Sequence, residues 1–214
     1  ITVMNAAGYS TEAVAELAIA MMIDLYRKVR ENDIITRACQ RKGIMPGREI
    51  GGKTVGIIGM GNIGQRVAEI AKVFGCKVLA WNRTPKSVAG VTFVDKETLL
   101  KESDIVTLHI ALNAETRDFI GEKDFALMKP SAILVNTARG PVVNEQALAK
   151  ALKNGTIAGA ATDVYGTEPP LKQDNPLFDA PNLLMLPHIG FATEEAFVLR
   201  LGIVVDNVEK WLAQ

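Results

Sequence analysis

The chain has 214 residues, of which 48% are hydrophobic and 22% charged, so it can bury the core of one domain of ordinary or slightly large size. Its 24 Lys and Arg side chains balance its 24 Asp and Glu, and no basic cluster occurs, which argues against nucleic acid as a partner. The most apolar helical stretch, AVAELAIAMMIDLY, carries Glu16 and Asp24 and is too short to span a bilayer, so we expect a soluble protein that does not enter a membrane.

The first expected elements are a short strand and a long helix. Residues 1–5, ITVMN, are typical of a strand, and they run into a helix that Ser10 or Thr11 can cap. A spacing of three and four predicts that one face of this helix is buried, formed by Val14, Leu17, Ala18, Met21, Leu25 and Val29. The chain opens on Ile1 without a leader pattern, so we interpret it as a fragment of a longer protein.

Alternating elements follow the polar segment 41–52. The β-rich segments, separated by helical patterns, are TVGIIGM, KVLAWN, DIVTLHI, AILVNT, IAGAATDV and NLLMLP. This alternation predicts an α/β architecture, a doubly wound and mainly parallel sheet with helices on both faces. A last helix, from about Thr193 to Ala213, is expected from the amphipathic pattern of Phe197, Leu201, Val204, Val205, Val208 and Leu212.

Two cysteines, Cys39 and Cys76, stand in unlike contexts without the spacing of a metal site. Free thiols are the default interpretation, and they indicate a reducing compartment. We therefore expect a cytoplasmic protein, and no metal ligands are assigned.

Polar side chains follow the predicted strands. In a doubly wound sheet, ligands bind beyond the carboxyl ends of the strands. The residues at or just past these ends are Asn82, His109, Thr137, Asp163 and His188. The binding site is therefore expected at this edge of the sheet.

The segment GMGNIG places Gly59, Gly61 and Gly64 between a predicted strand and a predicted helix. The first glycine permits a tight turn, the second lets a pyrophosphate approach the backbone, and the third allows close packing of the helix. The free N–H groups at the helix start favour an anion. In isolation the motif could be a plain glycine turn, whereas its strand and helix context predicts a Rossmann-type dinucleotide site.

The segment WNRT lies where an NAD-preferring site has an acidic residue on the ribose hydroxyls. It offers Asn82, Arg83 and Thr84, and no carboxylate. Without that negative charge a 2′-phosphate is not repelled, and a guanidinium with a neighbouring hydroxyl can bind it. We therefore predict a preference for NADP(H). The alternative is that Arg83 is a solvated loop residue and that NAD(H) is used.

Three more segments follow in order, VNTARGPVVNE, TDVYGTEPP and LPHIG. With the glycine motif, they make the sequence resemble the D-isomer-specific 2-hydroxyacid dehydrogenases, which include phosphoglycerate dehydrogenases and glyoxylate/hydroxypyruvate reductases. The resemblance covers the whole chain. It implies an oxidoreductase that transfers a hydride between NAD(P)H and a small 2-oxo or D-2-hydroxy acid, with Arg139, Glu168 and His188 as its catalytic residues.

These residue types suit the reaction on chemical grounds as well. Hydride transfer to a carbonyl carbon leaves charge on the oxygen, and an imidazole, His188, can protonate it. A carboxylate, Glu168, would stabilise the imidazolium and fix its tautomer. A forked guanidinium, Arg139, matches the substrate carboxylate and can polarise the keto oxygen. The alternatives are a hydrogen-bonded core histidine, a solvated carboxylate in a turn and a guanidinium bonded to a loop carbonyl.

The resemblance implies further cofactor contacts. Asn62 and Ile63 are expected at the pyrophosphate, and Ile110 and Ala111 beside the adenosine half. The nicotinamide side is assigned Thr137, Ala138 and Asp163, and Gly190 is also expected to bind the cofactor. Many relatives have Thr-Pro or a similar pair where this chain has Ile110 and Ala111, so only packing is expected there. His109 is expected to have a structural role.

The resemblance also predicts how the chain is organised. Residues 1–30 are expected to form an interdomain or dimerisation segment, 31–190 the NAD(P)-binding domain, and 191–214 a helix returning toward a second domain. Most of that second domain precedes the equivalent of Ile1 in family members, so we expect this chain to bind cofactor and to turn over poorly by itself. The apolar excess of the first helix agrees with a homodimer, and packing within the domain is the alternative.

A second functional interpretation is a cofactor-sensing interaction module, because transcriptional corepressors resemble the same family. Formate dehydrogenase relatives have Gln at the position of Glu168, so the carboxylate favours hydroxy-acid chemistry. The loops that select the oxo acid are expected before Ile1, and the sequence does not specify which acid is used.

Overall fold

One parallel sheet forms the centre of the protein, whose computed structural model describes residues 2–39, 43–84 and 86–213. The seven strands are β1 (Thr54–Ile58), β2 (Lys77–Trp81), β3 (Thr92–Phe93), β4 (Ile105–Leu108), β5 (Ile133–Asn136), β6 (Gly159–Thr162) and β7 (Leu183–Met185). Their order in space is β3-β2-β1-β4-β5-β6-β7, and every pair is parallel. The chain therefore builds the sheet outward from β1 in both directions, and the predicted doubly wound architecture is confirmed. The short edge strand β3 was not predicted.

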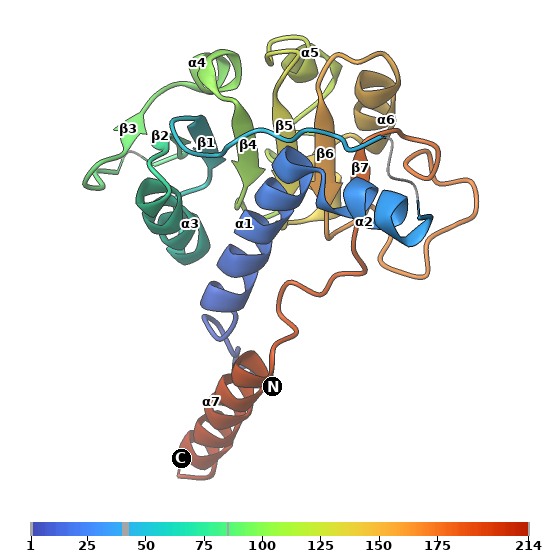
Figure 1. Cartoon of the computed structure of the whole chain (residues 1–214). Coiled ribbons are helices and arrows are strands. Elements are labelled where there is room, and N and C mark those ends of the chain that lie inside the picture. Colours follow the sequence, from blue (N-terminus) through green and yellow to red (C-terminus); the bar gives the residue numbers. More distant parts are fainter. Residues whose placement is uncertain (1, 40–42, 85, 214) are drawn as a thin grey trace.

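Helices cover both faces of this sheet (Figure 1). On one face lie α1 (Thr11–Arg27) and α3 (Asn62–Val73), and on the other lie α4 (Lys96–Glu102), α5 (Glu122–Phe125) and α6 (Glu145–Lys153). The remaining helices are α2 (Val29–Arg37), the 3-10 helix η1 (Gly140–Val142) and α7 (Glu194–Leu212).

Alternation along the strands supplies a core on each face. In β5, Ile133 and Val135 pack with α1 and α3, whereas Leu134 packs with the helices of the opposite face. All three side chains are at most 4% exposed. Strands that are buried on both faces favour apolar residues at nearly every position, which explains why their sequences are near-continuous apolar runs.

The strand predicted at residues 1–5 is wrong for the described residues 2–5, which have no regular structure. The edges of the sheet are β3 and β7, so no strand of the described residues pairs with this segment. It lies next to α7 instead, where the Asn207 amide donates a hydrogen bond to the Asn5 carbonyl at 3.0 Å. A strand requires a neighbour for its backbone N–H and C=O groups, and β-branched residues do not supply one.

Helix α1 starts where the sequence predicts and ends at Arg27. Ser10 occupies the N-cap position without a side-chain bond, and the Thr11 hydroxyl donates to the Gly8 carbonyl at 3.3 Å. Lys28 adopts a left-handed conformation, with φ of 54°, and this turn separates the two helices. Val29 consequently begins α2 and is exposed, so its assignment to the buried face was wrong.

The predicted apolar face of α1 packs inside its own domain. Val14, Ala18, Met21 and Leu25 are buried, and the helix contacts α3, β5 and β6. Packing within the domain accounts for the apolar excess that suggested an intermolecular contact. The homodimer remains a prediction that this face does not support.

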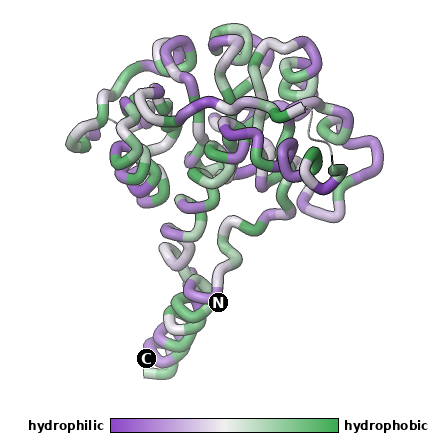
Figure 2. Tube along the Cα trace, in the orientation of Figure 1, coloured by the Kyte–Doolittle hydropathy of each residue, from purple (hydrophilic) through white to green (hydrophobic). Residues whose placement is uncertain are grey.

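The last helix, α7, projects away from the sheet (Figure 1). The Thr193 hydroxyl caps it by accepting a hydrogen bond from the Ala196 N–H at 3.1 Å. Ala196 is the buried residue of the helix. Hydrophobic residues nevertheless occur along its length (Figure 2), and those that are exposed include Phe197, Leu201, Val204, Val205, Val208 and Leu212.

Two further expectations concern the thiols and the membrane. Cys39 is exposed and Cys76 is buried, and both are free, as predicted. Burial raises the pKa of the Cys76 thiol. Within the described ranges, no helix combines the length and the apolarity needed to cross a bilayer.

Candidate active site

The predicted site residues lie at the carboxyl edge of the sheet. Asn82, His109, Thr137 and Asp163 directly follow β2, β4, β5 and β6, and His188 follows β7 in the LPHIG loop. Asn62 and Ile63 open α3, and Ala138 follows Thr137. The strand order thus gathers residues from distant parts of the sequence along one edge.

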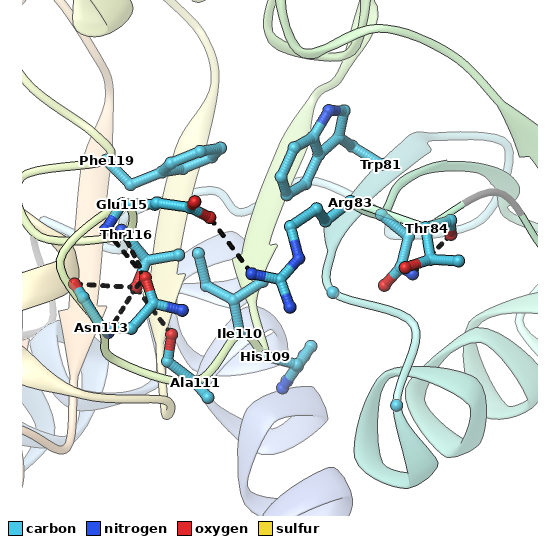
Figure 3. A pocket seen from close by; sticks show the side chains of 13 residues that line it. Trp81, Arg83, Thr84, His109, Ile110, Ala111, Asn113, Glu115, Thr116 and Phe119 are labelled. Atoms are coloured by element: carbon cyan, nitrogen blue, oxygen red, sulfur yellow. Dashed lines mark hydrogen bonds and ion pairs between the residues drawn. The ribbon is translucent and has the colours of Figure 1, made fainter.

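A pocket of about 370 Å³ lies beside the glycine turn (Figure 3). Its wall includes the expected Arg83, Ile110 and Ala111. The complete lining is Gly59, Gly61, Trp81, Asn82, Arg83, Thr84, His109, Ile110, Ala111, Asn113, Glu115, Thr116 and Phe119. The Trp81 and Phe119 rings meet with centroids 4.9 Å apart and give the pocket an aromatic side.

The three glycines of the GMGNIG turn differ in what a side chain would meet there. Gly59 has a φ of +103°, and a Cβ there would lie 2.7 Å from the His109 carbonyl carbon. A Cβ at Gly64 would lie 2.0 Å from the Gly59 carbonyl oxygen, so only glycine lets α3 approach the turn. A Cβ at Gly61 would meet no atom of the described residues within 4 Å. The space beside Gly61 is therefore open, and no N-cap side chain bonds the N–H groups at the start of α3, which is an arrangement that suits an anion.

Asn82 connects the two loops that form this end of the pocket. Its side-chain oxygen accepts from the Met60 N–H at 3.0 Å, and its amide donates to the Thr84 carbonyl at 2.7 Å. Lys86 adds a third connection, because its ammonium donates to the Met60 carbonyl at 2.7 Å. Asn82 thus shapes the loops as well as lining the pocket.

Arg83 reaches across the mouth of the pocket to Glu115 (Figure 3). Its Nη1 lies 3.1 Å from Glu115 Oε2, and each side chain is 72% exposed. Glu115 belongs to the loop after β4, far from WNRT in the sequence. No local pattern marks this residue, and the sequence analysis did not identify it.

His109 has the structural contact that the sequence analysis expected. Its Nε2 lies 3.0 Å from the Thr107 hydroxyl, and burial lowers the pKa of His109 to about 4, so the imidazole is neutral. Its Nδ1 is buried and has no hydrogen-bond partner among the described residues, and the same holds for the Thr137 hydroxyl. Buried polar atoms ordinarily have partners, so these two atoms fit an edge that receives a polar ligand.

Glu168 and His188 form the pair that the sequence analysis predicted. His188 Nδ1 lies 2.7 Å from Glu168 Oε2, and their side chains are 33% and 51% exposed respectively. His188 has a φ of 59°, a left-handed conformation that is uncommon for residues other than glycine. The carboxylate can stabilise an imidazolium and leaves the other ring nitrogen, Nε2, for a substrate.

A buried carboxylate holds the histidine loop. Asp163 accepts hydrogen bonds from the Ile189 N–H at 2.8 Å and from the Gly190 N–H at 2.7 Å. Burial raises the pKa of Asp163, while these two N–H groups and the nearby His188 act in the opposite direction. Asp163 and Gly190, which were both predicted to bind the cofactor, are thus hydrogen-bonded to each other.

Arg139 extends into solvent from the loop after β5. Its Nη1 donates to the Ala138 carbonyl at 2.6 Å, which is the loop-carbonyl contact considered as the alternative. Within the part of the chain that the structure describes, no hydrogen bond or ion pair joins it to Glu168 or His188. The next residue, Gly140, packs so closely on the backbone of Tyr165 that a Cβ would lie 1.8 Å from the Tyr165 carbonyl carbon. The arginine loop and the glutamate loop are therefore neighbours.

Two residues that the sequence analysis missed connect the loops of Glu168 and His188 to their surroundings. The Tyr165 hydroxyl donates to the Leu186 carbonyl at 2.7 Å, which joins the glutamate loop to the histidine loop. Glu145, at the start of α6, accepts from the Gly166 N–H at 2.6 Å. Neither contact has a local sequence signal, because each depends on loops that meet only in the folded chain.

Comparison with known proteins identifies the family. The model of the D-isomer specific 2-hydroxyacid dehydrogenase NAD binding domain matches residues 19–190. A glyoxylate reductase of Thermococcus litoralis is 47% identical over 220 residues, which cover 97% of this chain and 66% of that protein.

Solved structures agree. An acyclic imino acid reductase in complex with NADPH and D-Arg matches with a TM-score of 0.92 and 39% identity, covering 100% of this chain and 69% of that one. A D-lactate dehydrogenase from Aquifex aeolicus, complexed with NAD and lactic acid, matches with a TM-score of 0.89 and 30% identity, covering 96% and 68%. The chain spans about two thirds of the length of these proteins. It belongs to the D-isomer specific 2-hydroxyacid dehydrogenase family and contains that family's NAD-binding domain.

Proposed function

We propose that the protein transfers a hydride between NAD(P)H and a small 2-oxo or D-2-hydroxy acid. The observation that carries this proposal is the pair formed by His188 Nδ1 and Glu168 Oε2 at 2.7 Å, on the same sheet edge as the glycine turn. A relative named glyoxylate reductase and a solved D-lactate dehydrogenase support the substrate class.

Three side chains supply the acid–base and binding steps. His188 donates a proton from Nε2 to the substrate oxygen during reduction and accepts it during oxidation. Glu168 holds the ring through Nδ1 and stabilises its charged form. Arg139 binds the substrate carboxylate, because a guanidinium has five N–H donors and its contact with the Ala138 carbonyl uses one nitrogen. The nicotinamide, when bound, supplies or accepts the hydride.

The pocket of Figure 3 would hold the adenosine half of the cofactor. The open space at Gly61 and the start of α3 suit the pyrophosphate, with Asn62 and Ile63 beside it. Ile110 and Ala111 pack against the adenosine, and Thr137, Ala138, Asp163 and Gly190 lie toward the nicotinamide. Arg83 and Thr84 favour NADP(H), and NAD(H) remains possible.

Steady-state kinetics of the full-length protein test the reaction. Glyoxylate, hydroxypyruvate, pyruvate and phosphohydroxypyruvate should be compared with each cofactor. We expect turnover on at least one acid, and we expect His188→Ala to abolish turnover while cofactor still binds. Wild-type protein that binds cofactor and reduces none of these acids would favour the cofactor-sensing interaction module instead.

Cofactor titration tests the preference for NADP(H). We expect NADPH to bind more tightly than NADH, and Arg83→Asp to reverse the order because it places a carboxylate where the 2′-phosphate would lie. Equal affinities of the wild-type protein for NADPH and NADH would contradict the preference without contradicting the proposed hydride transfer. Sedimentation of the full-length protein tests the proposed homodimer separately.

A further inference from the structure

The pocket beside the glycine turn contains a charge pair that the sequence does not predict. Among the described residues that line it, Glu115 is the one carboxylate, and Arg83 is the one guanidinium or ammonium group. The two lie 3.1 Å apart at the mouth of the pocket (Figure 3). The WNRT segment lacks an acidic residue, so the acidic group of this pocket comes from the loop after β4.

Local hydrogen bonds fix the loop that presents Glu115. The Asn113 side-chain oxygen accepts from the N–H groups of Glu115 at 2.8 Å and Thr116 at 3.0 Å. The Thr116 hydroxyl donates to the Ala111 carbonyl at 2.7 Å. These bonds fix the backbone of the loop, so Glu115 stays within reach of the pocket mouth whichever partner the Arg83 guanidinium binds.

The exposure of the pair makes it exchangeable. Each side chain is 72% exposed, and exposed ion pairs are weak because water and salt screen them. A phosphate carries more charge than a carboxylate and can accept two hydrogen bonds from a guanidinium, whereas Glu115 accepts one from Arg83 Nη1. A phosphate can therefore displace the carboxylate. The displaced carboxylate then remains close to the phosphate and repels it.

We propose that Glu115 is a specificity-determining residue that competes with the 2′-phosphate of NADP(H) for Arg83. NAD(H) has no 2′-phosphate, so when it binds, Glu115 keeps its ion pair with Arg83. Glu115 thereby reduces the preference for NADP(H) that Arg83 creates, and the pocket admits both cofactors. This inference rests on the proposed placement of the adenosine half in this pocket.

The test compares dissociation constants of NADPH and NADH for the wild-type full-length protein and Glu115→Gln. We expect NADPH to bind about three- to fivefold more tightly to Glu115→Gln, since an exposed ion pair and a nearby like charge have effects of this size. NADH should change less than twofold. The gain for NADPH should shrink as salt is raised.

Two variants serve as controls. Glu122→Gln removes the same charge from another exposed pair, formed with Lys150 at 2.6 Å, and it should leave both constants unchanged. Compared with Arg83→Gln alone, the double variant Arg83→Gln/Glu115→Gln should show little of the NADPH gain, because the competition requires Arg83.

The outcomes separate this inference from the proposed function. The role of Glu115 would be overturned if Glu115→Gln binds NADPH no more tightly than the wild type, or if it gains equally for NADH. Neither result would contradict the proposed dinucleotide site. If the wild-type protein binds neither cofactor, the proposed function fails and the inference fails with it.

Discussion

Asp163 and Gly190 are joined by a hydrogen bond of 2.7 Å between the Gly190 N–H and the Asp163 carboxylate. The other oxygen of the same carboxylate accepts from the Ile189 N–H at 2.8 Å. Asp163 is 1% exposed, so water does not replace these bonds. The contact holds the loop in which His188 has its left-handed backbone conformation.

Asp163→Ala should therefore destabilise the protein and misplace His188, the proposed acid–base residue. Two N–H groups lose their acceptor, and we expect the free energy of unfolding to fall by about 2–4 kcal/mol. Asp163→Asn keeps the shape and one acceptor oxygen, so its loss should be intermediate. Denaturant unfolding measures both changes. A loss below about 0.5 kcal/mol for Asp163→Ala would show that the contact does not hold the loop.

Glu145 should act as a positioning residue for Glu168. Its carboxylate accepts from the Gly166 N–H at 2.6 Å and is 3.5 Å from the Asn175 amide, so it anchors the loop before Glu168. We expect Glu145→Ala to lower kcat several-fold, to leave the cofactor dissociation constant unchanged and to lower stability by about 1 kcal/mol. Glu145→Gln retains an acceptor oxygen and should restore most of kcat. Equal kcat values for Glu145→Ala and the wild type would rule out this role.

The sheet could be predicted from the sequence because its strands are buried on both faces. Such strands are continuous apolar runs, and β1, β4 and β5 are recognisable for this reason. The edge strand β3 has two residues and is not fully buried, so it leaves no run to recognise. At residues 2–5 the error is the opposite one, because a strand was predicted where the structure has none. β-branched residues form a strand only beside another strand.

The site was predictable where its chemistry is local. The glycine turn depends on short-range backbone contacts. The order of the three motifs that carry the family resemblance pointed to Glu168 and His188, which lie 2.7 Å apart. Contacts between loops were not predictable. Glu115 meets Arg83, and Glu145 meets Gly166, only because the strand order brings their loops together. The contact of Arg139 with the Ala138 carbonyl was considered in advance, although the sequence could not decide it.

His109 should make the stability of the protein depend on pH. Burial lowers the pKa of His109 to about 4, whereas an unfolded histidine has a pKa of about 6.5. Between these values the unfolded chain binds a proton that the folded chain does not, so stability falls as the pH falls. From about pH 7.5 to about pH 5 this loss is about 2 kcal/mol. Denaturant unfolding at both pH values measures this fall in the free energy of unfolding. For His109→Gln the fall should be smaller by about 2 kcal/mol. Parallel pH profiles for the two proteins would contradict the prediction.

Gly61 and Gly64 should respond differently to the same substitution. A Cβ at Gly64 would lie 2.0 Å from the Gly59 carbonyl oxygen, so Gly64→Ala must move α3 and should lower both the melting temperature and the affinity for cofactor. A Cβ at Gly61 meets no atom within 4 Å, and its φ of −75° suits alanine. Gly61→Ala should therefore lower stability by at most about 1 kcal/mol, which is the usual cost of placing alanine at an N-cap. Its methyl group would occupy space that the pyrophosphate needs, so NADPH and NADH should both bind at least about tenfold more weakly. Calorimetry and cofactor titration of the two variants measure this contrast, and normal cofactor affinity in Gly61→Ala would place the pyrophosphate elsewhere.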